Sequence, residues 1–280
     1  MIVYINGDFV QENEVKISPY DRGFLFGDGI YEVIRTYNGR LFKMDEHLNR
    51  LAYSLKEVRI NNFNVNIIKT IVDELIPRNN LSNDFAVYIQ ITRGVSFPRI
   101  HSFPPREIEP TVYVSTYPLI SVPDEIDNGI KVILKEDIRW TRCDIKSISL
   151  LPAILANQSA KENGASEAVF VRDGFITEGS HTNFFAVKNN IIHTPPLSNL
   201  ILSGITRDVI IEICKSNSFR IKEINLEEKE LKHFDEFFIT GTTTEVKPVI
   251  QIDNWTVKNG KPGDMTKKIQ KAFFQYVSNY

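Results

Sequence analysis

The sequence is poor in cysteine and histidine and contains no long apolar run. Its 280 residues include two cysteines, Cys143 and Cys214, too few for a disulfide framework or a structural zinc site. The five histidines show no metal-ligand spacing, so no metal is expected. No apolar stretch approaches the ~20 residues that span a bilayer, so no membrane partner is expected. Together with the strand-like start Met1–Ile5, these features favour a reducing cytoplasm.

An excess of charge of either sign is also lacking. Lys plus Arg total 33 and Asp plus Glu total 35, which gives a formal net charge of -2. This balance provides no broad attraction for nucleic acid or for an anionic membrane. A Gly-rich nucleotide loop, a serine nucleophile elbow and internal repeats are absent as well. Small molecules or proteins are therefore the expected partners.

The residues that are present predict an α/β protein of two domains. With 42% hydrophobic residues, the chain can bury one large core or two ordinary ones. Apolar runs flank turn residues at 6–8 and 37–39, which predicts two early hairpins. Apolar spacing predicts a helix capped by Asp45 and a second helix from Asn64 or Asn66 to Pro77. Strands are expected at 85–92 and 111–116, with an irregular, Pro-rich loop between them at 93–110.

A domain boundary is expected where residues 119–123 form a linker, between a smaller domain at 1–118 and a larger one at 124–280. In the larger domain the pattern restarts with alternating strands and helices. The expected elements are a strand at 130–134, a helix at 152–163, hairpins around 172–174 and 189–190, a helix at 206–215, a strand at 220–224, a short helix at 226–232, a strand at 236–240 and a terminal helix from Met265.

Two residues of the second half are candidates for amine and acid chemistry. Lys146 follows two arginines and precedes an apolar run, a setting in which nearby cations and partial burial favour a neutral amine, although Asp144 opposes them. The alternative is an ordinary lysine at a helix start. Glu178 ends a hairpin strand just before small hydroxyl residues, and a buried acid there needs a partner such as a pyridine nitrogen. The alternative is a cap or turn carboxylate.

Anion-binding features form a second group of candidates. Ser203–Thr206 opens a helix and Thr240–Thr244 follows a strand, so both offer backbone N–H groups and hydroxyls that suit a phosphate, although each is also an ordinary cap or turn. Arg50 could point inward at such a phosphate or reach solvent. Arg99 and His101, one residue apart, could clamp a carboxylate or belong to a solvated basic loop.

In order and spacing, several motifs resemble those of the class IV aminotransferases among the fold-type IV pyridoxal enzymes, and most closely those of the D-amino acid aminotransferases. The resemblance covers nearly the whole chain. Its motifs are Asp21–Gly23, Phe26–Gly29, His47–Leu51, Arg139–Ser147, Thr177–Ser180, Gly204–Arg207 and Thr242–Glu245.

The resemblance implies a two-domain fold with a smaller N-terminal α/β domain and a larger mixed C-terminal domain that binds pyridoxal 5′-phosphate. Lys146 is then the catalytic residue, which binds the cofactor as a Schiff base and moves the substrate proton. Glu178 pairs with the pyridine nitrogen. The other cofactor contacts implied are Arg50, Leu202, Ile205, Thr206, Gly241 and Thr242, of which Gly241 stands where relatives carry a hydroxyl residue.

Substrate contacts are implied in the same way for Tyr31, Arg99 and His101, which match the carboxylate trap of the D-specific members. In those relatives the arginine and histidine come from the other subunit, so a homodimer with a shared active site is implied. His181 departs from the usual row of small hydroxyl residues and alters the side-chain pocket. The expected reaction exchanges an amino group between a D-amino acid, of the D-alanine or D-glutamate type, and a 2-oxo acid.

Three alternatives to this reaction stay open. Branched-chain L-amino acid aminotransferases and aminodeoxychorismate lyases share the equivalents of Lys146, Glu178 and Arg50, so only the carboxylate trap separates them from the D-specific enzymes. A non-catalytic relative that binds a phosphate ligand is the third alternative.

Overall fold

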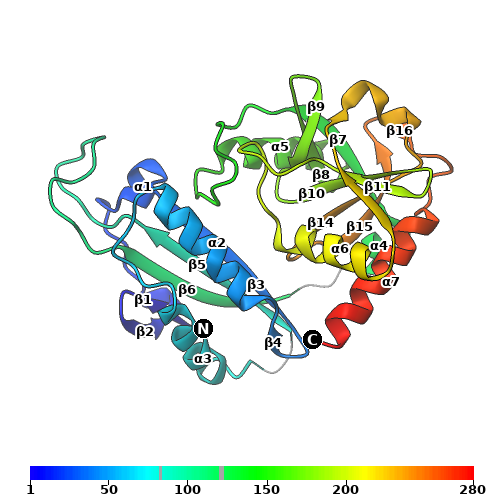
Figure 1. The fold of residues 1–280 in the computed structure, drawn as a ribbon. Helices are drawn as coiled ribbons and strands as arrows, with labels where there is room; N and C mark the ends of the chain where they lie inside the picture. Colours follow the sequence, from blue (N-terminus) through cyan, green and yellow to red (C-terminus); the bar gives the residue numbers. More distant parts are fainter. Residues whose placement is uncertain (82–83, 120–122) are drawn as a thin grey trace. The chain divides into compact units, whose positions relative to one another are not determined.

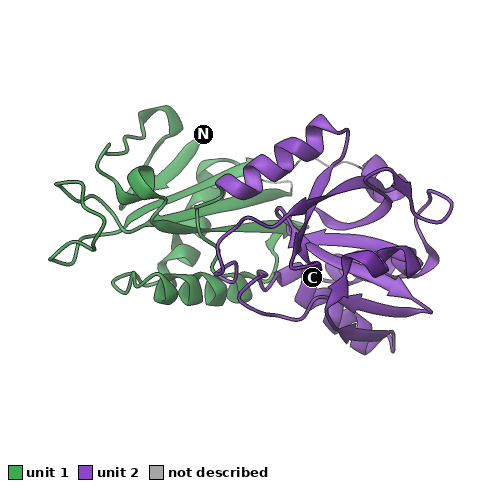
Figure 2. Ribbon diagram, turned by 90° about the horizontal axis from the view of Figure 1, so that it is seen from above, with its two compact units in different colours: residues 1–119, 145–150 green, residues 120–144, 151–280 purple. Residues whose placement is uncertain are grey.

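The chain folds into two compact units in a computed structural model that describes residues 1–81, 84–119 and 123–280 (Figure 1). Unit 1 comprises Met1–Leu119 together with Ile145–Leu150, and unit 2 comprises Ile120–Asp144 and Leu151–Tyr280 (Figure 2). The first unit thus takes a short segment from the second half of the chain. Of the expected linker, residues 120–122 lie outside the described residues.

Unit 1 is a six-stranded sheet with helices, and its chain order follows the hairpins expected from the sequence. The elements in order are β1 (Ile2–Ile5), β2 (Asp8–Gln11), the short 3₁₀ helix η1 (Glu12–Glu14), α1 (Arg22–Phe26), β3 (Gly29–Tyr37), β4 (Arg40–Leu41), α2 (Met44–Glu57), α3 (Ile67–Arg78), β5 (Phe85–Thr92) and β6 (Thr111–Pro118).

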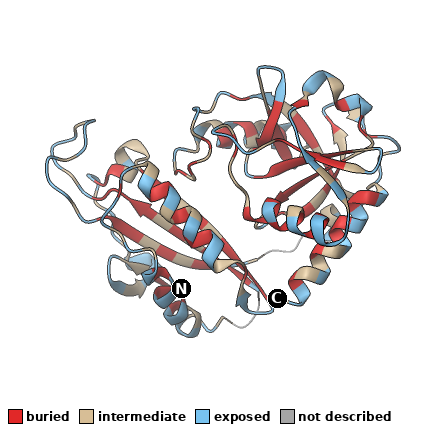
Figure 3. Cartoon of the chain, in the orientation of Figure 1, coloured by how far each residue is buried: buried red, intermediate tan, exposed pale blue. Residues whose placement is uncertain are grey.

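The sheet of unit 1 has the strand order β2-β1-β6-β5-β3-β4, with antiparallel neighbours. Alternate residues of its strands face one core, because side chains alternate between the two faces of a strand. Ile34, Ile89 and Val114 are fully buried there, against Leu51 of α2 and Leu75 of α3. Strands β3, β5 and β6 and the inner sides of α2 and α3 accordingly carry most of the buried residues of the unit (Figure 3).

The segment Ile145–Leu150 is held against the start of β3 by backbone hydrogen bonds. The N–H of Tyr31 donates to the carbonyl of Lys146 at 3.0 Å, and the N–H of Ile148 donates to the carbonyl of Gly29 at 3.1 Å. Ile145 is buried in the core of unit 1. These contacts place Lys146 in the first unit, although β6, the last strand of that unit, ends at Pro118.

Unit 2 contains one large mixed sheet and three long helices. Its elements in order are α4 (Pro123–Asn128), β7 (Ile130–Glu136), α5 (Leu151–Glu162), β8 (Glu167–Arg172), β9 (Phe175–Gly179), β10 (Asn183–Lys188), β11 (Ile191–Thr194), α6 (Ile205–Ser216), β12 (Arg220–Glu223), β13 (Leu226–Glu227), the 3₁₀ helix η2 (Glu228–His233), β14 (Glu236–Gly241), β15 (Glu245–Ile252), β16 (Trp255–Thr256) and α7 (Asp264–Ser278).

The sheet of unit 2 runs β12-β11-β10-β14-β15-β7-β8-β9-β13, with β16 paired to β15. Two apolar clusters involve this sheet. One includes Phe184, Phe237 and Val169, and in the other Phe170 packs with the alanines of α5. The sequence candidates of this unit lie at the ends of β9 and β14, in the turns that follow these strands, and in the segment that leads into the first turn of α6.

Several local expectations are wrong at the level of single elements. The N-cap of α2 is Lys43, and Asp45 lies in the first turn. The expected helix at 226–232 is a two-residue strand followed by a 3₁₀ helix. Strand β15 was not expected, because it contains Pro248, and proline cannot donate a hydrogen bond to a neighbouring strand.

Candidate functional site

Lys146 lies in a non-helical segment of unit 1 with its amine over an aromatic ring. Its Nζ is 4.3 Å from the centre of the Tyr31 ring, and its backbone N–H donates to Oγ of Ser54 at 3.2 Å. A cation at this distance from a tyrosine face is attracted by the ring. The alternative of a lysine at a helix start is wrong, because α5 begins only at Leu151. The lysine is half-buried and held from both sides of its backbone.

Arg50 is fixed by a buried carboxylate on the neighbouring strand. Glu32 of β3 accepts hydrogen bonds from Nε and Nη2 of Arg50 at 2.7 and 2.8 Å, and its Oε2 lies 2.8 Å from Nδ1 of His47. Burial alone would raise the pKa of Glu32, but Arg50 and His47 outweigh burial and hold that pKa well below its usual value. The pKa of His47 is lowered, mainly by burial. The Arg50 side chain is only 9% exposed, so the alternative in which it reaches solvent is wrong.

Arg99 and His101 share one aromatic contact in the exposed loop that follows β5. The guanidinium of Arg99 lies 4.4 Å from the centre of the Phe26 ring, and the His101 ring lies 5.4 Å from it. Arg22 donates to the carbonyls of Ile100 and His101 at 2.8 and 3.2 Å and so holds the loop backbone between the two candidates. The two side chains therefore lie together, and both are exposed on the surface of this chain.

Glu178 of β9 is a buried acid within a chain of ion pairs in unit 2. Its Oε1 accepts from Nη1 of Arg139 at 2.6 Å, and Arg139 in turn donates from Nε and Nη2 to Asp137 at 2.9 Å each. Burial would lower the pKa of Arg139, but Asp137 and Glu178 raise it, so the guanidinium stays charged. Because Glu178 is 4% exposed and hydrogen-bonded inside the unit, it is not a turn or cap carboxylate.

The second oxygen of Glu178 is fixed by the segment that leads into α6. The N–H of Leu202 donates to Oε2 of Glu178 at 3.0 Å, and Nδ2 of Asn183 donates to the same oxygen at 3.2 Å. Leu202 is half-buried and lies just before the helix, which begins at Ile205. The acid is therefore bound directly to the segment that leads into the helix.

Two backbone features of unit 2 fit an anion such as a phosphate monoester. Helix α6 spans Ile205–Ser216 and has Gly204 as N-cap with no side-chain capping hydrogen bond, so the N–H groups of its first turn, including those of Ile205 and Thr206, have no side-chain cap. The tight connection 242–244 joins β14 to β15 and begins with Thr242, directly after Gly241. A Cβ added at Gly241 would meet no atom closer than 3.4 Å, so the missing hydroxyl residue would fit there.

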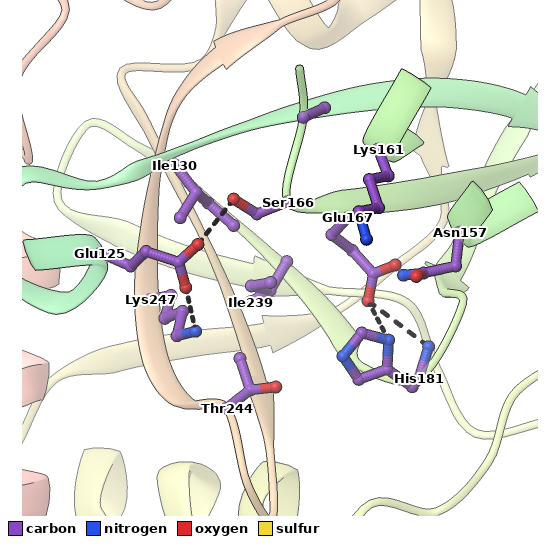
Figure 4. A pocket seen from close by; sticks show the side chains of 11 residues that line it. Glu125, Ile130, Asn157, Lys161, Ser166, Glu167, His181, Ile239, Thr244 and Lys247 are labelled. Atoms are coloured by element: carbon purple, nitrogen blue, oxygen red, sulfur yellow. Dashed lines mark hydrogen bonds and ion pairs between the residues drawn. The ribbon is translucent and has the colours of Figure 1, made fainter. Parts of the chain in front are cut away.

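His181 faces a pocket of about 330 Å³ that is formed entirely by residues of unit 2 (Figure 4). Its Nδ1 lies 3.0 Å from Oε2 of Glu167, a carboxylate that also accepts from Oγ of Ser180 at 2.5 Å and Oγ1 of Thr182 at 2.9 Å. Burial would raise the pKa of Glu167, but His181 and Ser180 lower it to about 2. One ionised acid therefore holds the whole turn after β9 and orients the His181 ring.

Four residues with evident roles in these arrangements carried no assignment from the sequence: Glu32, His47, Asn183 and Glu167. Their burial was predictable only in part. Glu32 lies midway between Ile30 and Ile34 in its strand, and alternation places all three on the core face. A charged residue at a core position is a signal for a buried ion pair, and this signal could have identified Glu32.

The structural candidates thus fall into two sets. Lys146, Tyr31, Arg50, Arg99 and His101 belong to unit 1. A second set belongs to unit 2: Glu178, His181, Leu202, Ile205, Thr206, Gly241 and Thr242. Each set is ordered by its own buried ion pair, Glu32 with Arg50 in the first and Glu178 with Arg139 in the second.

Within the described ranges, no cluster of three or more His, Cys, Asp or Glu side chains could hold a metal ion. In the same part of the chain, no helix is long and apolar enough to cross a membrane. The polar groups in the two units are donors, namely cationic side chains, hydroxyls and backbone N–H groups, together with carboxylate acceptors, a set that suits a phosphorylated heterocycle and a carboxylate ligand.

Comparison with known proteins identifies the class to which this fold and these residues belong. The family model for class IV aminotransferases matches residues 29–252. The chain belongs to the class IV aminotransferases, whose members are pyridoxal-phosphate enzymes that act on amino acids and 2-oxo acids.

Comparison by sequence and comparison by structure return relatives with different names. A D-alanine aminotransferase of Staphylococcus haemolyticus is 42% identical over 99% of this chain and 98% of its own length, and one of Bacillus licheniformis is 42% identical over 97% and 95%. Among solved structures, a branched-chain amino acid aminotransferase of Escherichia coli matches with a TM-score of 0.89 and 27% identity, covering 98% of this chain and 93% of that chain. A branched-chain aminotransferase of Thermoproteus uzoniensis, solved with norvaline, matches with a TM-score of 0.88 and 27% identity over 100% and 95%.

Proposed function

We propose that this protein transfers the amino group of a D-amino acid, of the D-alanine or D-glutamate type, to a 2-oxo acid. The observation that carries the proposal is the 42% identity to D-alanine aminotransferases over nearly the full length of both chains. The likeness to branched-chain aminotransferases is strong in fold but lower in sequence, at 27%. Since members of one family share the fold and differ in the residues around the substrate, the sequence identity is the better guide to the substrate.

Bound pyridoxal phosphate supplies an electron sink and an aldehyde that accepts the amino group. Lys146 would hold this group covalently, and its amine, when free, would carry a proton to and from the substrate α-carbon. The Tyr31 ring, whose centre lies 4.3 Å from Nζ, would stabilise this amine in its protonated form. Glu178 pairs with the pyridine nitrogen and keeps it protonated, with Arg139 and the N–H of Leu202 fixing its two oxygens.

We assign phosphate binding to three groups: a cationic side chain, the start of a helix and a turn. Arg50 supplies the positive charge, and Glu32 keeps its guanidinium in one orientation. At the start of α6, the backbone N–H of Ile205 and the hydroxyl of Thr206 donate, favoured by the helix dipole. The backbone of Gly241 and the hydroxyl of Thr242 complete the set, and Leu202 packs beside the ring.

Substrate selection is assigned to Tyr31, Arg99 and His101 acting on the α-carboxylate. Arg99 offers a planar fork that matches a carboxylate, and its contact with Phe26 keeps it beside His101. Both residues are exposed in the single chain and are therefore accessible to the active site of a second copy. His181, which Glu167 orients, limits the side-chain pocket and adds a polar group to it.

A homodimer is part of the same proposal and is supported by an exposed apolar surface on α5. Leu151, Ile154 and Leu155 are 65, 58 and 56% exposed and lie on one face, whereas Ala153 and Ala156 face the core. Large apolar residues clustered in this way mark a protein interface. Leu155→Glu should shift the protein towards monomer in sedimentation analysis, while Lys161→Glu on the same helix should not.

Two free and buried thiols, Cys143 and Cys214, agree with the proposed reducing cytoplasm. Burial raises the pKa of Cys143 to about 11 and that of Cys214 to about 12, so neither thiol is a nucleophile at neutral pH.

The test of the function is a paired product assay on the purified holoenzyme. With D-alanine and 2-oxoglutarate we expect pyruvate and D-glutamate in equal amounts. Production of L-glutamate from L-leucine and 2-oxoglutarate, without any D-alanine turnover, would support the branched-chain alternative instead. A colourless protein that ignores added pyridoxal phosphate would support the non-catalytic alternative. Release of pyruvate from aminodeoxychorismate without amino transfer would support the lyase.

A further inference from the structure

Asn183 adds a side-chain link between the end of β9 and the segment that enters α6, two places in unit 2 that the N–H of Leu202 also joins. It is the first residue of β10, and it is 6% exposed. Its Nδ2 donates to Oε2 of Glu178 at 3.2 Å and to the carbonyl oxygen of Leu202 at 3.0 Å. The N–H of Leu202 donates to the same Oε2 of Glu178 at 3.0 Å. One amide side chain thus joins the end of β9 to the segment that enters α6.

The other atom of this amide explains the glycine at the start of the helix. A Cβ built on Gly204 would lie 1.9 Å from Oδ1 of Asn183, which is far inside any tolerated contact. Gly204 is the N-cap of α6, so the amide of Asn183 lies directly against the backbone that begins the helix. Both polar atoms of the side-chain amide are therefore in contact with neighbours. The nitrogen donates to Glu178 and to the Leu202 carbonyl, and the oxygen occupies the space beside Gly204.

We propose that Asn183 is a positioning residue that sets the distance between Glu178 and the first turn of α6. The inference rests on the proposed function, in which Glu178 meets the ring nitrogen and Ile205 and Thr206 meet the phosphate of one rigid molecule. A rigid ligand with two anchored ends requires both anchors to be held in fixed register. Asn183 provides this register with an uncharged donor, which adds no charge beside the ion pair of Glu178 with Arg139.

A role limited to the fold makes a different prediction from a positioning role. If Asn183 only satisfied the Leu202 carbonyl, its loss would lower the stability of the apoprotein and weaken every ligand to a similar degree. If it positions Glu178, its loss should weaken ligands that use the ring nitrogen, and this loss should depend on Glu178 being present. Coupling of this kind is what a double-mutant cycle measures.

The experiment measures binding to the apoprotein of three probes: pyridoxal 5′-phosphate, pyridoxal without phosphate, and inorganic phosphate. Asn183→Leu keeps the shape of the side chain and removes its donors. We expect it to weaken pyridoxal and pyridoxal phosphate by about 10-fold or more, because a hydrogen bond to the charged carboxylate of Glu178 is lost. In the Glu178→Gln background, the further effect of Asn183→Leu on pyridoxal should fall below about 3-fold.

A second variant keeps the test informative if Asn183→Leu does not fold. Asn183→Asp has nearly the same size but places a carboxylate against Oε2 of Glu178. It should bind pyridoxal weakly at pH 8 and recover part of the affinity at pH 5, where a proton can be shared between the two acids. Asn199→Ala is the matched control, because that amide donates at 2.7 Å to the carbonyl of Thr141 in an exposed loop. Its affinities should stay within about 2-fold of the original protein, as expected for a surface substitution.

Two results overturn the inference. One is an unchanged affinity for pyridoxal and pyridoxal phosphate in both Asn183 variants. The other is a loss in Asn183→Leu that is equal in the presence and absence of the Glu178 carboxylate. Failure of the proposed function is distinguishable, since the unmodified protein would then fail to bind pyridoxal phosphate and borohydride would fix nothing to Lys146.

Discussion

The carboxylate of Glu32 and the guanidinium of Arg50 form a buried, two-bonded pair, with Oε1 to Nε at 2.7 Å and Oε2 to Nη2 at 2.8 Å. Glu32 is fully buried and also meets His47. Two parallel bonds fix the plane of the guanidinium as well as its position. The orientation of Arg50, and with it the phosphate contact assigned to this residue, therefore depends on one acid that does not itself meet the ligand.

Replacing Glu32 by Gln tests this dependence. The variant leaves Arg50 charged and poorly paired in a buried place, which should lower the free energy of unfolding by about 3 kcal/mol. It should also weaken pyridoxal phosphate binding more than pyridoxal binding, because only the former carries the phosphate. Urea denaturation and ligand titration measure the two effects.

The matched control is Glu46→Gln on the same helix as Arg50, where the acid is 47% exposed and pairs with Lys43 at 3.3 Å. Such a pair contributes less than ~1 kcal/mol, so stability and cofactor affinity should be nearly unchanged. Equal behaviour of the Glu32 and Glu46 variants would remove Glu32 from the phosphate site.

Arg99→Ala should raise the KM for D-alanine by about 10- to 100-fold while the cofactor stays bound, because a charge-assisted bond to the substrate carboxylate, worth ~1.5–3 kcal/mol, is lost. Steady-state kinetics with D-alanine as the varied substrate, together with the absorbance of the bound cofactor, give both quantities. Arg106→Ala, in the same exposed loop, should leave KM unchanged. If both variants behave alike, Arg99 is not part of the carboxylate trap.

Gly241→Ser should strengthen cofactor binding. The space around Gly241 accepts a Cβ, since the nearest atoms are the His181 carbonyl oxygen and Oγ1 of Thr244 at 3.4 Å each. A hydroxyl at this turn adds one donor for a phosphate, which corresponds to a roughly 2- to 10-fold lower dissociation constant. Gly241→Ala is the control that adds the carbon without the donor. Tighter binding in both variants alike would assign the gain to the backbone and not to the hydroxyl.

Acid pH should loosen the turn after β9 through Glu167. The pKa of this acid is lowered from 4.5 to about 2 in the folded protein, so its contribution to stability is complete above pH 4.5 and is lost as the pH falls towards 2. A shift of this size corresponds to about 3 kcal/mol. Glu167→Gln should be less stable at pH 7 and should show a smaller further loss as the pH falls below 4.5.

Denaturation by urea at about pH 7, 4.5 and 3 measures the difference, because between about pH 4.5 and 3 the unfolded chain takes up this proton while the folded protein largely does not. Glu162→Gln, at the exposed end of α5, is the matched variant and should follow the original protein at every pH. A pH dependence of Glu167→Gln identical to that of the original protein would show that another group is responsible.

The sequence predicted the elements whose patterns are local. The hairpin turns at Asn6–Gly7 and Asp173–Gly174, and most helices, follow from turn chemistry and from helical spacing of apolar residues. Strand β15 escaped prediction because Pro248 interrupts its pattern, and its pairing with β7 contains a register shift at Val249–Gln251. Tertiary pairing on both sides outweighs the local penalty there.

The sequence predicted which residues are candidates, but not which side chains hold them in place. Lys146, Glu178 and Arg50 stand in motifs that a sequence displays directly. Their supports are non-local: Glu32 lies 18 residues from Arg50, and Arg139 lies 39 residues from Glu178. The division of the chain is non-local too, because Ile145–Leu150 joins unit 1 through backbone bonds to β3. Neither periodicity nor propensity carries information about such pairings.

A single-turnover reaction of the purified holoenzyme with D-alanine and, separately, with L-leucine, without any 2-oxo acid, tests directly which amino acid the protein uses. D-Alanine should convert the bound cofactor from its aldehyde form to its amine form, seen by absorbance, with one pyruvate released per active site. Conversion by L-leucine with no response to D-alanine would contradict the proposed function.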